Sequence, residues 1–99
     1  MAVSEKTIEQ ELCQRVKELG GLCLKWVSPG CAGVPDRITF LPGGQIHFVE
    51  LKAPGKSAKP RQRVVIAWLR RLGCYVWELN SLEDVEMMIK TVQGKEVMS

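Results

Sequence analysis

Apolar residues recur at helical spacing at the start of the chain. Four of them fall on one face of a helix predicted over residues 4–19: Ile8, Leu12, Val16 and Leu19. Ser4 precedes this stripe as the expected N-cap, and Gly20 follows it as the expected stop, because serine caps helix amides and glycine tolerates positive φ. The pattern predicts a first helix that packs through one apolar face.

Two later segments show the same periodicity. A helix over 60–72 is expected to begin at Pro60, which suits a first helical turn, and to stop at Gly73. Its predicted inward residues are Val65, Ile66, Leu69 and Leu72. A last helix is expected after Ser81 as its N-cap, with a flexible, frayed tail after Gln93. Its predicted inward residues are Leu82, Val85, Met88, Ile89 and Val92.

Short apolar runs between these helices predict strands. The runs cover residues 22–27, 37–41, 45–52 and 74–79. Pro42-Gly43-Gly44 separates the second run from the third, which is the pattern of a β-hairpin. The element order is therefore helix, strand, strand, strand, helix, strand, helix. This order predicts a single α/β domain over 1–99, with helices flanking a mixed β-sheet.

Three charged residues stand at the ends of this hairpin, where strands normally bury apolar side chains: Asp36, Glu50 and Lys52. Side chains alternate along a strand, so Glu50 and Lys52 point to the same face. A three-residue loop pairs Leu41 with Gln45 and, counting outward, Asp36 with Glu50. The hairpin thus predicts that the three charges meet, although a bulge would slip the register by one residue.

Two neighbouring carboxylates repel each other unless one is protonated or a cation lies between them. Oxygen ligands suit Mg²⁺ or Mn²⁺, and Mg²⁺ typically takes one or two carboxylates with water and substrate phosphate. Such a site would hydrolyse a phosphodiester, with Lys52 orienting water or stabilising the developing charge. The alternative is an ordinary salt bridge between Lys52 and one of the acids at the strand end.

Basic residues follow the hairpin closely. The formal net charge of +3 is too small by itself to indicate a nucleic-acid partner. Seven lysines and arginines nevertheless lie within twenty residues that hold no acid: Lys52, Lys56, Lys59, Arg61, Arg63, Arg70 and Arg71. Such a cluster beside an acidic site favours binding to a phosphate backbone, although a solvated helix face gives the same pattern. The residues expected to contact DNA are Ser28, Arg37, Lys56, Lys59, Arg61 and Arg63.

Composition excludes several classes of protein. The 45% hydrophobic and 25% charged fractions are those of an ordinary globular chain, and no apolar run approaches the ~20 residues of a membrane span. The N-terminus lacks the apolar region of a signal peptide, so we expect a cytoplasmic, non-secreted protein with no membrane partner. The four cysteines show no C-x-x-C spacing and are expected to be free thiols: Cys13, Cys23, Cys31 and Cys74.

These motifs resemble one family of nucleases. The "PD" at Asp36, the acid Glu50 and the "ELK" that ends at Lys52 match the PD-(D/E)XK signature. The surroundings are more specific: "GGLCLKWVSPGCAGVPDRI", "PGGQIHFVELKAPG", a helix with Gln62 near its start, and "LGCYVWEL". Together they are similar to the VRR-NUC (virus-type replication-repair nuclease) branch, specifically its small stand-alone members from phages and bacteria.

The resemblance implies a restriction-endonuclease-like fold and a Mg²⁺- or Mn²⁺-dependent endodeoxyribonuclease. It implies that Asp36 and Glu50 are metal ligands, with the backbone carbonyl of Leu51 as a third. It further implies that Lys52 is the catalytic lysine. The alternative for each acid is the salt bridge described above.

Two side chains from flanking helices are expected to complete the site. The resemblance implies a site role for Gln62, although a polar residue in a first helical turn is common, and Lys59 stands where relatives often have a capping Ser or Thr. It also implies an acid on the first helix. Glu5 falls near the centre of that helix's apolar arc and Glu9 near its edge. We choose Glu9, because its spacing to Gly20 resembles the archaeal Holliday-junction resolvases, and keep Glu5 as the alternative.

The resemblance also bears on substrate and assembly. The stand-alone relatives look like resolvases, which act in DNA repair as homodimers because a four-way junction needs two matched cuts. We therefore expect a structure-specific endonuclease that acts on branched or junction DNA as a homodimer. One alternative is a non-catalytic nucleic-acid-binding subunit on the same fold. Another is an RNA-directed or nicking nuclease that uses the same site.

Overall fold

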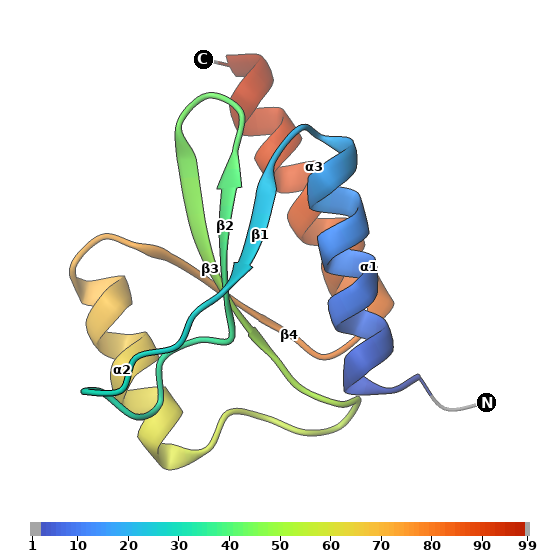
Figure 1. Cartoon of the computed structure of the whole chain (residues 1–99). Coiled ribbons are helices and arrows are strands. Elements are labelled where there is room, and N and C mark those ends of the chain that lie inside the picture. Colours follow the sequence, from blue (N-terminus) through green and yellow to red (C-terminus); the bar gives the residue numbers. More distant parts are fainter. Residues whose placement is uncertain (1–2, 99) are drawn as a thin grey trace.

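The structure is a computed structural model that describes the backbone of residues 3–98 and the side chains of residues 3–94. Its elements follow the predicted order (Figure 1): α1 (Glu5–Glu18), β1 (Leu22–Lys25), β2 (Arg37–Leu41), β3 (Gln45–Leu51), α2 (Pro60–Arg71), β4 (Tyr75–Leu79) and α3 (Leu82–Met98). The prediction of an α/β fold with helices flanking a sheet is confirmed. Within the described residues, no helix is both long and apolar enough to cross a membrane.

The sheet is mixed, as predicted, with strand order β1-β2-β3-β4. β1, β2 and β3 are antiparallel, whereas β4 pairs parallel to β3. Leu41 pairs with Gln45 and Phe40 with Ile46, so the three-residue loop has the predicted register without a bulge. Gly43 and Gly44 have φ of +84° and +76°, a conformation that only glycine adopts readily.

The helices form layers on both faces of the sheet (Figure 1). α1 and α3 cover one face and bury the larger core, whose members are Ile8, Leu12, Val16, Leu41, Val49, Leu51, Leu79, Val85, Met88, Ile89 and Val92. α2 covers part of the other face through a smaller cluster of Ala58, Ile66 and Val76. Phe48 and Glu50 alternate with Val49 and Leu51 on β3, so the two charged ends of the hairpin belong to the α2 side.

The helix ends follow local chemistry. Ser4 Oγ accepts the Thr7 amide at 3.1 Å, and Ser81 Oγ accepts the Asp84 amide at 3.0 Å, so both predicted caps are confirmed. Gly20 stops α1 with φ of +85°. α3 continues to Met98, and fraying after Gln93 stays a prediction.

Two predicted inward residues are wrong. Leu72 is 71% exposed, because it follows Trp68 by one helical turn and shares the outer face of α2 with Trp68 and Val64 rather than the face of Ile66. Leu82, at the first turn of α3, is 38% exposed, because it lies at the rim of a cavity outside the main core.

Candidate active site

The hairpin brings the three predicted charges together. The Leu51 amide donates to Asp36 Oδ2 at 2.8 Å, which holds the Asp36 carboxylate against the end of β3. Lys52 Nζ lies 2.9 Å from Glu50 Oε2. The Asp36 carboxylate is close enough to Glu50 to raise its pKa by charge repulsion, in addition to the larger effect of burial. The predicted convergence of the three side chains is therefore present in the structure.

Glu50 is the unusual member of the group, because its side chain is 0% exposed. Burial raises its pKa, and the ion pair with Lys52 only partly opposes that rise. Apart from this ion pair, neither carboxylate oxygen accepts a well-formed hydrogen bond from the described part of the chain. Buried charged oxygens are costly unless they are paired and hydrogen-bonded. The pair of acids can thus accommodate further positive charge.

Lys52 is held as an ammonium group. Burial by itself would lower its pKa, but the hydrogen bond and charge of Glu50, with smaller contributions from Asp36 and Glu5, raise it. A lysine with a raised pKa stays protonated near neutral pH, so it can donate hydrogen bonds but cannot act as a general base. Lys52 also lines a small pocket of about 60 Å³ with Lys56, Ser57, Glu78, Leu79 and Asn80.

The two acids of α1 have different partners. Glu9 Oε2 accepts from Arg37 Nε at 2.9 Å, and Arg37 Nη1 also donates to the Cys23 carbonyl at 3.1 Å. Glu5 is exposed and acts electrostatically on Lys52. The structure therefore brings Glu5 toward the site and engages the Glu9 carboxylate with Arg37. The metal-binding role of either acid stays a prediction, as does the DNA-contact role of Arg37.

Gln62 has a local structural role. Its Oε1 accepts the Lys59 amide at 3.0 Å, which forms one half of a capping box at the start of α2. The other half is missing because a lysine side chain offers no acceptor. Because Oε1 is already engaged, Gln62 would contact a substrate or water through its Nε2 amide group. That contact stays a prediction.

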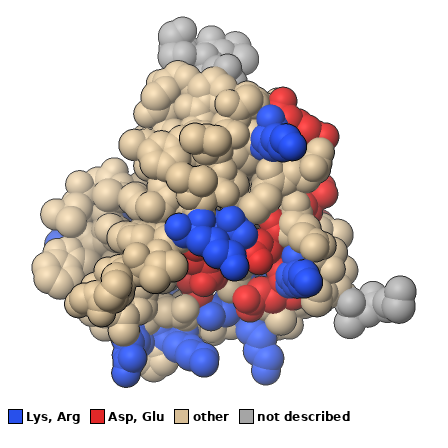
Figure 2. Space-filling model, viewed as in Figure 1, with Lys and Arg blue, Asp and Glu red and all other residues tan. Residues whose placement is uncertain are grey.

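The predicted DNA-contacting residues lie on two segments beside the site. Lys56 and Lys59 are exposed in the loop after β3, and Arg61 and Arg63 are exposed in the first turns of α2. Ser28 is half-buried in the loop between β1 and β2. Figure 2 shows lysine and arginine side chains along the lower edge of the molecule, below α2 and the loop that precedes it.

β4 adds residues that the sequence did not single out. Glu78 pairs with Glu50 in the parallel register, so its side chain emerges beside Glu50 on the same face. It is engaged by Arg70 at 3.4 Å and by Arg63 at 4.0 Å. Glu78 thus anchors the start and end of α2 to the sheet edge next to Lys52. Sequence spacing could not identify it, because parallel pairing joins segments that are distant along the chain.

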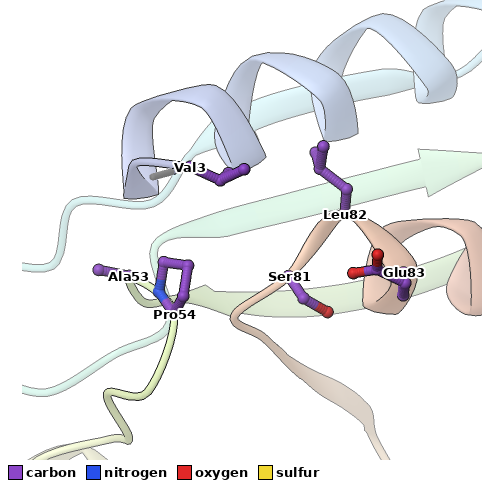
Figure 3. A pocket seen from close by; sticks show the side chains of 6 residues that line it. All are labelled: Val3, Ala53, Pro54, Ser81, Leu82 and Glu83. Atoms are coloured by element: carbon purple, nitrogen blue, oxygen red, sulfur yellow. The ribbon is translucent and has the colours of Figure 1, made fainter. Parts of the chain in front are cut away.

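Two other features are separate from the three charges. A mainly apolar cavity of about 520 Å³ includes Ala53, the residue after Lys52, in its lining (Figure 3); its lining residues are Val3, Ala53, Pro54, Ser81, Leu82 and Glu83. His47 is buried on the opposite face of the sheet. Trp77 Nε1 donates to its Nδ1 at 2.9 Å, and Gln45 Oε1 lies 3.1 Å from Nε2, so Nε2 carries the proton.

The donor set resembles an open site rather than a closed metal cage. Among the described residues, no three His, Cys, Asp or Glu side chains gather in a group that could enclose a metal ion. Mg²⁺ sites commonly use only one or two carboxylates and complete their shell with water and phosphate. Asp36, Glu50 and the nearby backbone carbonyls are oxygen donors of this kind.

Two known proteins are similar to the chain over nearly its whole length. No family model matches the chain. The chain is 43% identical over 90 residues to the "Putative nuclease p44" of Acyrthosiphon pisum secondary endosymbiont phage 1, a match that covers 91% of this chain and 96% of that protein. A solved structure described as "VRR_NUC domain" matches with a TM-score of 0.83 and 31% identity, covering 90% of this chain and 97% of that chain.

Proposed function

Because the chain belongs to the VRR-NUC family of nucleases, we propose that it is a Mg²⁺- or Mn²⁺-dependent endonuclease that hydrolyses phosphodiester bonds in branched DNA. The observation that carries this proposal is the buried Glu50 carboxylate. It lies beside a second carboxylate, and among the described side chains its only strong partner is the Lys52 ammonium. Burying such a carboxylate lowers the stability of the fold, whereas a bound cation would compensate its charge.

Asp36 and Glu50 are the proposed metal ligands, with the Leu51 carbonyl as a third oxygen donor. The Leu51 amide fixes one Asp36 oxygen, so the orientation of that carboxylate is set before any ligand arrives. When bound, the cation would neutralise charge on the phosphate and lower the pKa of water. The acidic pair supplies hard oxygen atoms, which suit Mg²⁺ and Mn²⁺.

Glu5 is the first-helix acid that the contacts favour. Its charge acts on Lys52, whereas the Glu9 carboxylate is held by Arg37 at 2.9 Å. We therefore assign Glu5, the alternative in the sequence analysis, to the site. Glu9 is assigned to the anchoring of α1 against β2.

Lys52 is assigned to the reacting phosphate and Gln62 to the attacking water. The raised pKa of Lys52, caused by Glu50 and its acidic neighbours outweighing burial, keeps it protonated. It would therefore donate hydrogen bonds to a phosphate oxygen as charge develops there, without taking a proton from water. Gln62 would orient the attacking water through Nε2.

Substrate binding is assigned to the basic residues beside the site. The loop that carries Lys56 and Lys59 continues directly from Lys52, and Arg61 and Arg63 follow in α2. A continuous row of exposed cations leading away from a hydrolytic site supports the binding of a phosphate backbone.

A homodimer is supported by the outer face of α2. Val64, Trp68 and Leu72 are 64%, 62% and 71% exposed and recur every four residues. This stripe forms one side of an apolar groove of about 480 Å³, and Trp26 and Val34 are among the residues that line its other side. In a twofold interface, the grooves of the two copies would face each other, so that the stripe of each copy packs against the groove lining of its partner. A buried aromatic anchor of this kind is typical of protein interfaces.

The substrate assignment is tested with a panel of labelled DNAs: a four-way junction, a flap, a plain duplex and an RNA version of the flap. We expect the purified protein with Mn²⁺ to cut the branched DNAs faster than the duplex by at least about tenfold. Equal cutting of duplex and branched DNA would remove the structure-specific part of the proposal. Binding of the junction without cleavage in either metal would favour a non-catalytic binding subunit, and preferential RNA cleavage would favour an RNA-directed nuclease.

A further inference from the structure

Two cysteines from different elements lie side by side, away from the three charges of the active site. Cys13 is in α1 and Cys23 is in β1, and their Sγ atoms are 3.0 Å apart. A disulfide bond is ~2.05 Å long, so the sulfurs need to approach by only about 1 Å. Both side chains are half-buried, whereas Cys31 is exposed in a loop and Cys74 lies beside α2.

The connection between α1 and β1 explains why the two thiols meet. Gly20 turns the chain with φ of +85°, and its amide donates to the Lys17 carbonyl at 2.9 Å. A Cβ at Gly21 would lie 2.4 Å from the Phe40 carbonyl oxygen, so only glycine allows β1 to leave the turn this close to β2. β1 therefore runs back beneath α1, and Cys23 packs against the core that α1 covers.

We propose that Cys13 and Cys23 are an oxidative modification site that forms an intramolecular disulfide with a disulfide oxidant such as oxidised glutathione. Cys13 Sγ attacks one sulfur of the oxidant and releases the first glutathione as a thiol. Cys23 Sγ then attacks the Cys13 sulfur of this mixed disulfide, and the second glutathione leaves with the proton from Cys23. The protein loses two protons and two electrons, and the oxidant is reduced to two thiols.

The surroundings support this order of events. Burial, reinforced by the neighbouring Cys13, raises the pKa of Cys23 to about 12, so Cys23 is a neutral thiol near neutral pH. A neutral thiol reacts slowly with an oxidant in solution, so the initial attack is assigned to Cys13, and Cys23 reacts only with the sulfur that is already beside it. Once Cys13 carries a glutathione, Cys23 is already within reach of its sulfur and has no competing thiol nearby among the described residues.

The disulfide would tie α1 to the sheet next to an existing polar anchor. Arg37 donates to both the Cys23 carbonyl and the Glu9 carboxylate, so the same corner already joins α1, β1 and β2. A covalent link there restricts the unfolded chain and removes independent motion of α1 from β1. We expect oxidation to raise the melting temperature by about 10 °C.

The test uses the full chain treated with oxidised glutathione and then mapped by mass spectrometry without reduction. The expected product has lost two hydrogen atoms and contains tryptic peptide 7–15 linked to peptide 18–25, since trypsin cleaves after Lys6, Arg15, Lys17 and Lys25. Cys31→Ser and Cys74→Ser are matched controls and should show the same product and the same rise in melting temperature.

Three outcomes would overturn the proposal: no link between these two peptides, stable mixed disulfides on Cys13, or a principal product that links Cys31 of two molecules. Cys13→Ser should lose both the internal link and the thermal shift. If that variant fails to fold, the peptide map of the unmodified sequence decides the question by itself.

Discussion

The Leu51 amide donates a hydrogen bond to the Asp36 carboxylate at 2.8 Å, which joins the two ends of the β2–β3 hairpin. Asp36 precedes β2, and Leu51 is the last residue of β3. The Asp36 side chain therefore takes the place of a backbone carbonyl as the hydrogen-bond partner of the Leu51 amide. As a result, an acid from the loop and Glu50 from the strand are held at the same edge of the sheet.

Asp36→Asn and Asp36→Ala separate this structural contribution from chemistry. Asparagine keeps an oxygen that can accept the Leu51 amide, so its free energy of unfolding should stay close to that of the unmodified protein. Alanine leaves that amide without its charged partner and should lower the free energy of unfolding by about 2 kcal/mol. Both should cut DNA at least about 100-fold more slowly. Urea denaturation with a cleavage assay checks this, and equal stability of the two variants would contradict the structural role.

Glu50→Gln should stabilise the metal-free protein at neutral pH while abolishing cleavage. The neutral amide avoids the free-energy cost of burying a charge, which is the main cause of the raised pKa of the Glu50 carboxylate. We expect a melting temperature a few degrees above that of the unmodified protein at pH 7, measured by circular dichroism in EDTA. A lower melting temperature would mean that the ion pair with Lys52 outweighs the cost of burial.

The stability gain of Glu50→Gln over the unmodified protein should decrease as pH falls. The folded state raises the pKa of Glu50, so folding favours its protonated form. The stability that comes from this protonation is fully present below the unfolded pKa and is lost as pH rises through the higher folded pKa. The difference between Glu50→Gln and the unmodified protein should therefore shrink from pH 7 toward pH 4. A difference that grows with acidification would contradict the direction of the shift.

Glu5→Gln and Glu9→Gln form a matched pair on one helix. Glu5→Gln should weaken Mn²⁺ binding about tenfold in calorimetric titration, with little change in stability, because Glu5 is exposed and acts on Lys52. Glu9→Gln should lower the free energy of unfolding by about 1 kcal/mol, because it weakens a half-buried ion pair with Arg37, and should leave Mn²⁺ affinity unchanged. The reverse pattern would return Glu9 to the metal site.

Trp68→Glu should convert the proposed dimer to a monomer. Trp68 is 62% exposed in the described chain, so the substitution costs the single copy little, but a twofold interface would bury one carboxylate from each copy in an apolar contact. Light scattering coupled to size exclusion measures the mass directly. Lys90→Glu, on α3 and away from the stripe, is the matched charge control and should remain dimeric. A monomeric unmodified protein would remove the proposed interface.

The parts of the fold that were predicted correctly depend on local rules. Loop length and the glycines at 43 and 44 determine the hairpin register, and this register brings Asp36 to Glu50. Helical periodicity likewise identified the buried stripe of α1, and serine chemistry identified both caps. Each of these features is decided within about fifteen residues of sequence.

The features that sequence could not predict depend on how distant elements pack. The parallel pairing that places Glu78 beside Glu50 joins strands separated by α2. The rotation of α1 on the sheet determines that Glu9 meets Arg37 while Glu5 acts on Lys52. Leu72 was expected inside because helical spacing does not reveal how much of α2 the sheet can cover.

Single-turnover cleavage of an end-labelled four-way junction tests the central claim most directly, namely that Asp36, Glu50 and Lys52 form a metal-dependent hydrolytic site. The unmodified protein is compared with Lys52→Gln in Mn²⁺ and in EDTA, with folding checked by circular dichroism and junction binding by gel shift. We expect cleavage by the unmodified protein in Mn²⁺ only, and a rate at least about 100-fold lower for folded, junction-binding Lys52→Gln. Cleavage that persists in EDTA, or an unchanged rate in Lys52→Gln, would contradict the account.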